Sequence, residues 1–85
     1  MDIEGTIKNI SEETRFESGF YKRTLLLETG GEYPQVLPID FLKEKADGLR
    51  NYRAGQKVKV AFDLRGKEYN GRHFVDLNGW KVSEA

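Results

Sequence analysis

Apolar and polar residues alternate along several short stretches of the chain, and this alternation predicts β-strands. It is clearest in the segment 58–64, where the apolar positions are Val58, Val60, Phe62 and Leu64. A strand that buries one face shows this period of two. The leucine-rich segment 20–29 and the segment 33–41 are two further predicted strands. The second should lie at a sheet edge or be irregular, because Pro34 and Pro38 cannot donate hydrogen bonds to a ladder.

The opening segment 3–10 is also a predicted strand, with Ile3 and Ile7 on one face and Gly5 between them. A glycine at such a position indicates a bulge or a sharp bend, since it places no side chain where one should pack. The polar residues 11–19 that follow are typical of a loop. The first two predicted strands therefore form a hairpin with a fairly long connection.

Between residues 41 and 52 the apolar period changes from two to that of a helix. Leu42, Ala46 and Leu49 recur at helical spacing, and Asp40 stands just ahead of them as a candidate N-cap. Gly48 lowers the helical propensity and marks a possible end. We therefore expect one short helix here.

The closing strands form a predicted hairpin around Asn70–Gly71, because both of these residue types accept the positive φ angles of a tight turn. In the returning strand, 74–82, the apolar residues occupy both parities: Val75 and Leu77 on one, Trp80 and Val82 on the other. A bulge at Asn78–Gly79 would turn all four side chains inward. On this reading Trp80 belongs to the core, and stacking on a base is the alternative for this residue.

The predicted order is strand, strand, strand, helix, strand, strand. This is the order of an all-β, five-stranded Greek-key barrel of the OB type, with one short helix between strands three and four. Barrel closure also removes exposed strand edges. An open antiparallel sheet covered by one helix is the alternative. A chain of 85 residues suits a single OB-fold domain, residues 1–85.

Composition narrows the functional classes. Fourteen Lys and Arg residues balance fourteen Asp and Glu residues, so only a local patch could attract a polyanion. The chain has no cysteine and therefore no disulfide framework or thiolate metal site. It shows neither a signal-peptide pattern nor an apolar run of membrane-spanning length, so we expect a cytoplasmic protein that does not contact a membrane.

Matches to a known family span nearly the whole chain. They are Ile3-Glu4-Gly5, Lys22-Arg23 with Leu27-Glu28-Thr29, Tyr33-Pro34-Gln35, Gly55 with Val58 and Val60, and, most specifically, RGKEYNGRHFVDLNGW from Arg65 to Trp80. These pieces resemble the small OB-fold proteins of Bacteroidetes and their phages that form a family of unknown function. The resemblance implies an OB fold related to single-stranded DNA-binding proteins. The family often carries an aromatic residue near the start of the leucine run, and Thr24 to Leu27 has none, which reduces a stacking platform on that strand.

OB folds bind ligands across strands two and three, between the loops that join strands one to two and four to five. Here both regions combine aromatic rings, which stack on exposed bases, with Lys and Arg, which contact phosphates. The candidate nucleic-acid-binding residues are Phe20, Tyr21, Lys22, Arg23, Tyr33, Arg65, Lys67, Tyr69, Arg72 and Phe74. The alternative for any one of them is that the ring packs over a barrel end or that the charge is an ordinary solvated one.

No catalytic motif is present in the sequence. His73 is the single histidine, and neither a phosphate-binding glycine loop nor a nucleophile elbow occurs. We therefore expect no catalytic residues, no metal, no cofactor and no enzymatic activity.

Two functions remain open. The first is binding of single-stranded nucleic acid, DNA before RNA, with little sequence preference and as a possible homo-oligomer. The second is a protein interaction or assembly module that uses the same loops or a strand edge, because aromatic and Arg residues also anchor protein interfaces.

Overall fold

The computed structural model describes all residues, Met1–Ala85. The elements are β1 (Asp2–Ile10), β2 (Thr14–Arg15), β3 (Tyr21–Glu28), β4 (Val36–Leu42), α1 (Glu44–Asp47), the 3-10 turn η1 (Gly48–Asn51), β5 (Lys57–Tyr69) and β6 (Arg72–Glu84). None of the helical segments is long and apolar enough to cross a membrane.

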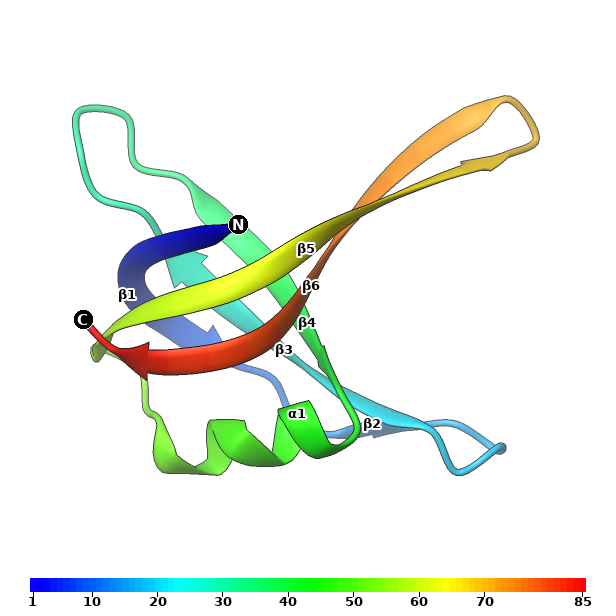
Figure 1. The fold of residues 1–85 in the computed structure, drawn as a ribbon, viewed down its shortest axis with the longest axis horizontal. Coiled ribbons are helices and arrows are strands. Elements are labelled where there is room, and N and C mark those ends of the chain that lie inside the picture. Colours follow the sequence, from blue (N-terminus) through cyan, green and yellow to red (C-terminus); the bar gives the residue numbers. More distant parts are fainter.

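The strands close into a barrel (Figure 1). Their order is β1-β5-β6-β4-β3, and β1 pairs with β3 to complete the circle, while the two-residue β2 pairs with Tyr21 and Lys22 at the start of β3. All pairings are antiparallel except β4 with β6, which is parallel and joins only Asp40 to Asn78 and Phe41 to Gly79. The predicted five-stranded OB barrel is confirmed, with its short helix between the third and fourth barrel strands.

The core fills the barrel with side chains from alternate strand positions. Its ten buried residues are Ile7, Leu25, Leu27, Ile39, Phe41, Ala46, Leu49, Val58, Val60 and Phe62. Those on strands keep the predicted period of two, and Ala46 and Leu49 reach the core from α1 and η1. The helical segment therefore closes one end of the barrel, as the OB order predicts.

Of the bulge or sharp bend predicted at Gly5, the bulge was wrong, because Gly5 pairs with Val58 in an unbroken register; its role is a close approach between strands. The bulge of β1 lies between Ile7 and Asn9, in its pairing with β3. A Cβ atom on residue 5 would lie 2.6 Å from the carbonyl oxygen of Glu28. β1 pairs with β5 through its first half and with β3 through its second, and only glycine lets the neighbouring backbone come this near.

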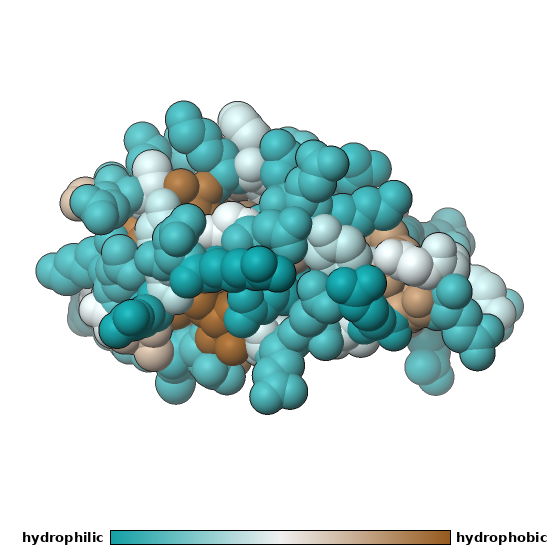
Figure 2. Space-filling view, turned by 90° about the horizontal axis from the view of Figure 1, so that it is seen from below, coloured by the Kyte–Doolittle hydropathy of each residue, from teal (hydrophilic) through white to brown (hydrophobic).

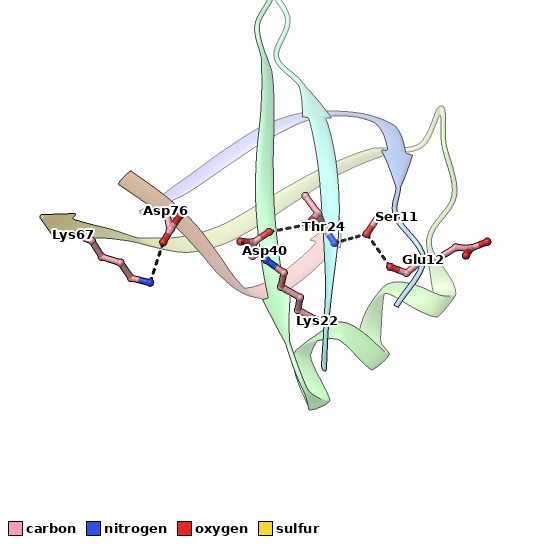
Figure 3. A network of polar contacts seen from close by, with 7 residues as sticks. All are labelled: Ser11, Glu12, Lys22, Thr24, Asp40, Lys67 and Asp76. Atoms are coloured by element: carbon pink, nitrogen blue, oxygen red, sulfur yellow. Dashed lines mark hydrogen bonds and ion pairs between the residues drawn. The ribbon is translucent and has the colours of Figure 1, made fainter. Parts of the chain in front are cut away.

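The helix begins later than expected, and the prediction of Asp40 as its N-cap was wrong. Lys43 occupies that position with φ 49° and makes no side-chain cap. Asp40 lies within β4, where its carboxylate accepts a hydrogen bond of 2.8 Å from the hydroxyl of Thr24 on β3 (Figure 3). Gly48 does end α1, and the chain continues as the 3-10 turn η1.

The β5–β6 hairpin extends well beyond the barrel (Figure 1). Its tip is the predicted turn, with φ angles of 51° at Asn70 and 76° at Gly71. The inward orientation expected for Val75 was wrong, because no opposing sheet covers the projecting part of the hairpin. Val75 is 68% exposed there, and Leu64 at the start of the same part is 50% exposed.

The bulge expected at Asn78–Gly79 lies instead at Trp80–Lys81, and it leaves Trp80 outside the core, so both expectations were wrong. Ala61 pairs with Lys81 and Phe62 with Gly79, so Trp80 is the extra residue. Both residues of such a two-against-one pairing face the same side of the sheet, and Trp80 is 48% exposed. Gly79 points inward in its place because the Phe41 ring fills the space where a side chain would lie.

Candidate nucleic-acid interface

A groove of about 530 Å³ crosses the outer face of β3 and β4. Lys22, Asp40 and Leu42 form its floor, and Asn78 of β6 lies beside them. One wall is the loop between β2 and β3, with Phe16 and Phe20; the other is the β5–β6 hairpin, with Arg65, Lys67 and Asp76. This is the place at which OB folds hold their ligands.

The aromatic wall is a folded loop tip. The rings of Phe16 and Phe20 lie 5.7 Å apart with an interplanar angle of 42°. Backbone hydrogen bonds from Phe16 N–H to the Phe20 carbonyl (2.8 Å) and from Gly19 N–H to the Phe16 carbonyl (3.0 Å) close the turn. Gly19 takes φ 86°, which glycine adopts without strain. The Lys43 ammonium lies 5.7 Å from the Phe20 ring, so a positive charge already faces this aromatic surface.

Two of the three cations in the groove are held by carboxylates (Figure 3). Lys22 Nζ lies 3.8 Å from Asp40, and Lys67 Nζ lies 3.6 Å from Asp76. Arg65 forms no ion pair. The lining therefore has one positive charge in excess, and Arg65 is the cation most free to meet an incoming anion.

The hairpin presents its charges and rings on one face. Arg65, Lys67 and Tyr69 of β5 pair directly with Asp76, Phe74 and Arg72 of β6. Residues opposite one another in an antiparallel ladder share a face, so all six side chains lie on the side that continues the groove wall. We call these six residues the hairpin face. Tyr69, near the tip, is 71% exposed.

Tyr21 and Arg23 do not line the groove. They share the parity of Leu25 and so turn toward the end of the barrel rather than its outer face. The Tyr21 hydroxyl donates to Asp47 on α1 (3.0 Å), and Arg23 Nε donates to the carbonyl of Ser11 (3.0 Å). Both side chains thus tie the first loop and the helix to β3.

Tyr33 lies outside the groove as well. It precedes β4 in the connecting loop and is 80% exposed, and it does not lie on the strand in which the sequence placed it. Of the ten candidate residues, four line the groove: Phe20, Lys22, Arg65 and Lys67. Three more, Tyr69, Arg72 and Phe74, extend it along the hairpin face.

Sequence reasoning left five groove residues out of the candidate list: Phe16, Asp40, Leu42, Asp76 and Asn78. Phe16 carries a usable signal, because a Ser-Gly turn between it and Phe20 predicts that the two rings meet. The other four lie on β4 (Asp40 and Leu42) and on β6 (Asp76 and Asn78). Their meeting depends on the parallel contact of β4 with β6, which no local pattern shows.

The profile of the family described as "Domain of unknown function (DUF3127)" matches residues 2–83. The chain belongs to this family. No curated protein matches the DUF3127 chain.

Solved structures with the same fold cover almost all of this DUF3127 chain. The second single-stranded DNA-binding protein of Mycobacterium smegmatis superimposes with a TM-score of 0.74 at 17% identity, covering 100% of this chain and 84% of the other. The single-stranded DNA-binding domain of a Synechococcus protein gives 0.75 at 15% identity, covering 96% and 90%. The dimeric N-terminal domain of PriB from Thermoanaerobacter tencongensis gives 0.72 at 22% identity, covering 98% and 91%. These likenesses establish the OB fold.

In this DUF3127 domain the contact of Tyr21 with Asp47 predicts an alkaline destabilisation. Hydrogen bonding to the Asp47 carboxylate, then desolvation, raises the pKa of Tyr21 above its ordinary 10.0. A raised pKa in the folded state stabilises the fold fully below pH 10, and this contribution is lost as the pH rises through the folded-state pKa. We expect the unfolding free energy of the wild type to fall between about pH 9 and pH 12, and that of Tyr21→Phe to fall less over the same range. Urea unfolding at several pH values measures both.

The matched control is Tyr33→Phe, which removes an exposed phenol that no hydrogen bond holds. If both variants followed the wild-type pH dependence, the Tyr21–Asp47 contact would contribute nothing to the stability of the fold.

Proposed function

We propose that this protein is a non-catalytic OB-fold binding protein for single-stranded nucleic acid, DNA before RNA, with little sequence preference. The strand would cross β3 and β4 in the groove and continue along the hairpin face. Phe16, Phe20, Tyr69 and Phe74 would stack on bases, and Lys22, Arg65, Lys67 and Arg72 would contact phosphates.

The groove carries this proposal, since it has rings on one wall and cations on the other. A single strand exposes both chemistries at once: bases that stack at about 1–3 kcal/mol each and a phosphate at every step. A duplex hides the faces of its bases inside the stack, so the rings of the aromatic wall would have no base to stack on. The DNA-binding proteins of the same fold add support at the level of architecture alone.

Titration of labelled oligo-dT, followed by fluorescence anisotropy at several salt concentrations, tests the proposal. The slope of log affinity against log salt is about −0.7 for each phosphate contact to a single strand. Three or four contacts therefore predict a slope of about −2 to −3, and an affinity about 20- to 50-fold lower at 200 mM than at 50 mM salt.

The control is the duplex of the same length, which should bind more weakly at each salt concentration. Equal affinity for duplex and single strand, or no binding of oligo-dT at low salt, would contradict the proposed function.

The hairpin also supports a second candidate function, protein interaction or self-assembly. On the face opposite the hairpin face, Leu64 and Val75 are exposed, and the overall charge of zero does not oppose association. Light scattering over a range of protein concentrations tests this candidate. A mass of one chain at every concentration would rule out a stable homo-oligomer.

A further inference from the structure

Trp80 is the one tryptophan of the chain, and its side chain stands outward beside that of Lys81. Both occupy the β6 bulge opposite Ala61, whose small side chain lines a hollow beside them. A half-exposed tryptophan on a β-bulge requires a physical reason, because Trp80 is not one of the residues that form the core or pack against it. None of the proposed groove contacts uses it.

Two hollows lie on either side of the indole ring. One, of about 290 Å³, lies between Trp80 and the helical segment, with Glu44, Asn51 and Tyr52 in its lining. The other, of about 220 Å³, lies over the outer face of β5 and β1, with Asp2 and Lys59 in its lining. Trp80 and Lys81 line both hollows, so the ring is a ridge with open space on both sides.

Lysine surrounds this ridge. Lys45 lines the first hollow, Lys59 the second and Lys81 both. Lys59 lies 3.9 Å from Asp2, but Lys45 and Lys81 form no ion pair. Figure 2 views the molecule from the side of α1 and shows mainly hydrophilic side chains with only small apolar areas between them. The charged side chains in the lining of the two hollows suit a charged ligand better than a large apolar protein partner.

The ridge continues the groove. Asn78 lines the groove and stands two residues before Trp80 on the same strand, a spacing of about 7 Å. Leu42, in the groove lining, ends β4, and Glu44, two residues further on at the start of α1, lies in the lining of the first hollow. A strand that leaves the groove over Asn78 therefore reaches Trp80 without crossing the barrel.

We propose that Trp80 is a second base-stacking platform, which extends the single-strand path from the groove past α1, with Lys45 and Lys81 contacting the phosphates on either side. This inference rests on the proposed function and lengthens its binding site. A short oligonucleotide would occupy the groove alone, and a longer one would also cover Trp80.

The test compares oligo-dT of about 4 and about 16 nucleotides, which bracket the site sizes of single OB folds. Because Trp80 is the only tryptophan, its fluorescence reports on this position directly. We expect saturating 16-mer to quench it strongly and saturating 4-mer to leave it nearly unchanged. Trp80→Ala should weaken 16-mer binding about 5- to 150-fold, the loss of one stacked base, without changing 4-mer affinity.

Trp80→Phe is the matched variant, since it keeps a ring on the bulge and should keep most of the 16-mer affinity. Lys45→Glu with Lys81→Glu should weaken the 16-mer while leaving the 4-mer unchanged. Thermal unfolding of each variant checks that the barrel is intact.

The outcomes separate this inference from the function on which it rests. If wild-type protein binds no oligo-dT, both are overturned. If Arg65 and Lys67 prove necessary for binding while Trp80→Ala binds the 16-mer normally and no quenching occurs, the groove stands and the Trp80 platform is overturned. Equal losses for 4-mer and 16-mer in a folded Trp80→Ala protein would also overturn it, because Trp80 would then act through the groove.

Discussion

Replacing Arg65 and Lys67 together with glutamate is expected to weaken binding of a 16-nucleotide oligo-dT by about 100-fold at low salt. Contacts to charged groups contribute about 1.5–3 kcal/mol each, and two losses at the lower end of that range equal this factor. Arg65 has no carboxylate partner, whereas Lys67 forms an ion pair with Asp76, which also lines the groove. The reversed charges would in addition repel the phosphates from the hairpin wall. Anisotropy titrations of wild type and variant measure the difference.

Lys8→Glu with Lys57→Glu is the control for this experiment, because it changes the net charge by the same amount away from the groove. Lys8 pairs with Glu28, at the far end of β3 from Lys22, and Lys57 lies at the start of β5. We expect this control to lose no more than a few-fold in affinity. Similar losses in the two variants would mean that total charge, and not the groove, drives binding.

Gly79→Ala is expected to lower the unfolding free energy by about 3 kcal/mol, the upper range for overpacking a core. A Cβ atom at residue 79 would overlap three carbons of the Phe41 ring. The ring is buried among core residues, and its own strand is fixed to β6 at this point by the parallel pairing. For a domain of this size the loss corresponds to a fall in Tm of roughly 12–24 °C. Thermal and urea unfolding measure it.

Gly66→Ala is the matched control on the partner strand, since an added Cβ there meets nothing within 4 Å. Its stability should be unchanged or slightly higher, because alanine restricts the unfolded chain more than glycine does. Combining Gly79→Ala with Phe41→Leu should recover part of the loss, because the smaller side chain makes room for the new methyl. Independent, additive losses would show that the two positions do not compete for the same space.

The Phe41–Gly79 contact joins the fold to the proposed function. It fixes the crossing of β4 with β6, and the groove floor at Leu42 and Asn78 lies directly beside it. The bulge that follows Gly79 turns Trp80 outward. Milder substitutions at this crossing should therefore disturb nucleic-acid binding as well as stability.

The local pattern of the sequence was sufficient to predict the elements of the barrel and their order. Period-two alternation located the strands, the change of period located the helical segment, and Asn70–Gly71 located the hairpin turn. Each of these signals acts between near neighbours, through the pleat of a strand or the φ angles of a turn. The order of the elements then led to the OB fold.

The roles of individual side chains depended on the tertiary structure. Alternation shows which residues share a face of a strand, but it cannot show where the opposing sheet ends, and Val75 is exposed for that reason. A bulge reverses the parity of the residues that follow it, and because it lies at Trp80–Lys81 rather than at Asn78–Gly79, Val82 turns inward but Trp80 stays outside.

The candidate site divides in the same way. The sequence alone determined that rings and cations gather in the two loops that an OB fold uses for its ligands. Only the tertiary structure decided that Lys22, Arg65 and Lys67 meet across one groove while Tyr21 and Arg23 brace the helix and the first loop. The physical reason is that these contacts join strands far apart in the chain, and their register is set by barrel closure and by the space that Gly79 leaves for Phe41.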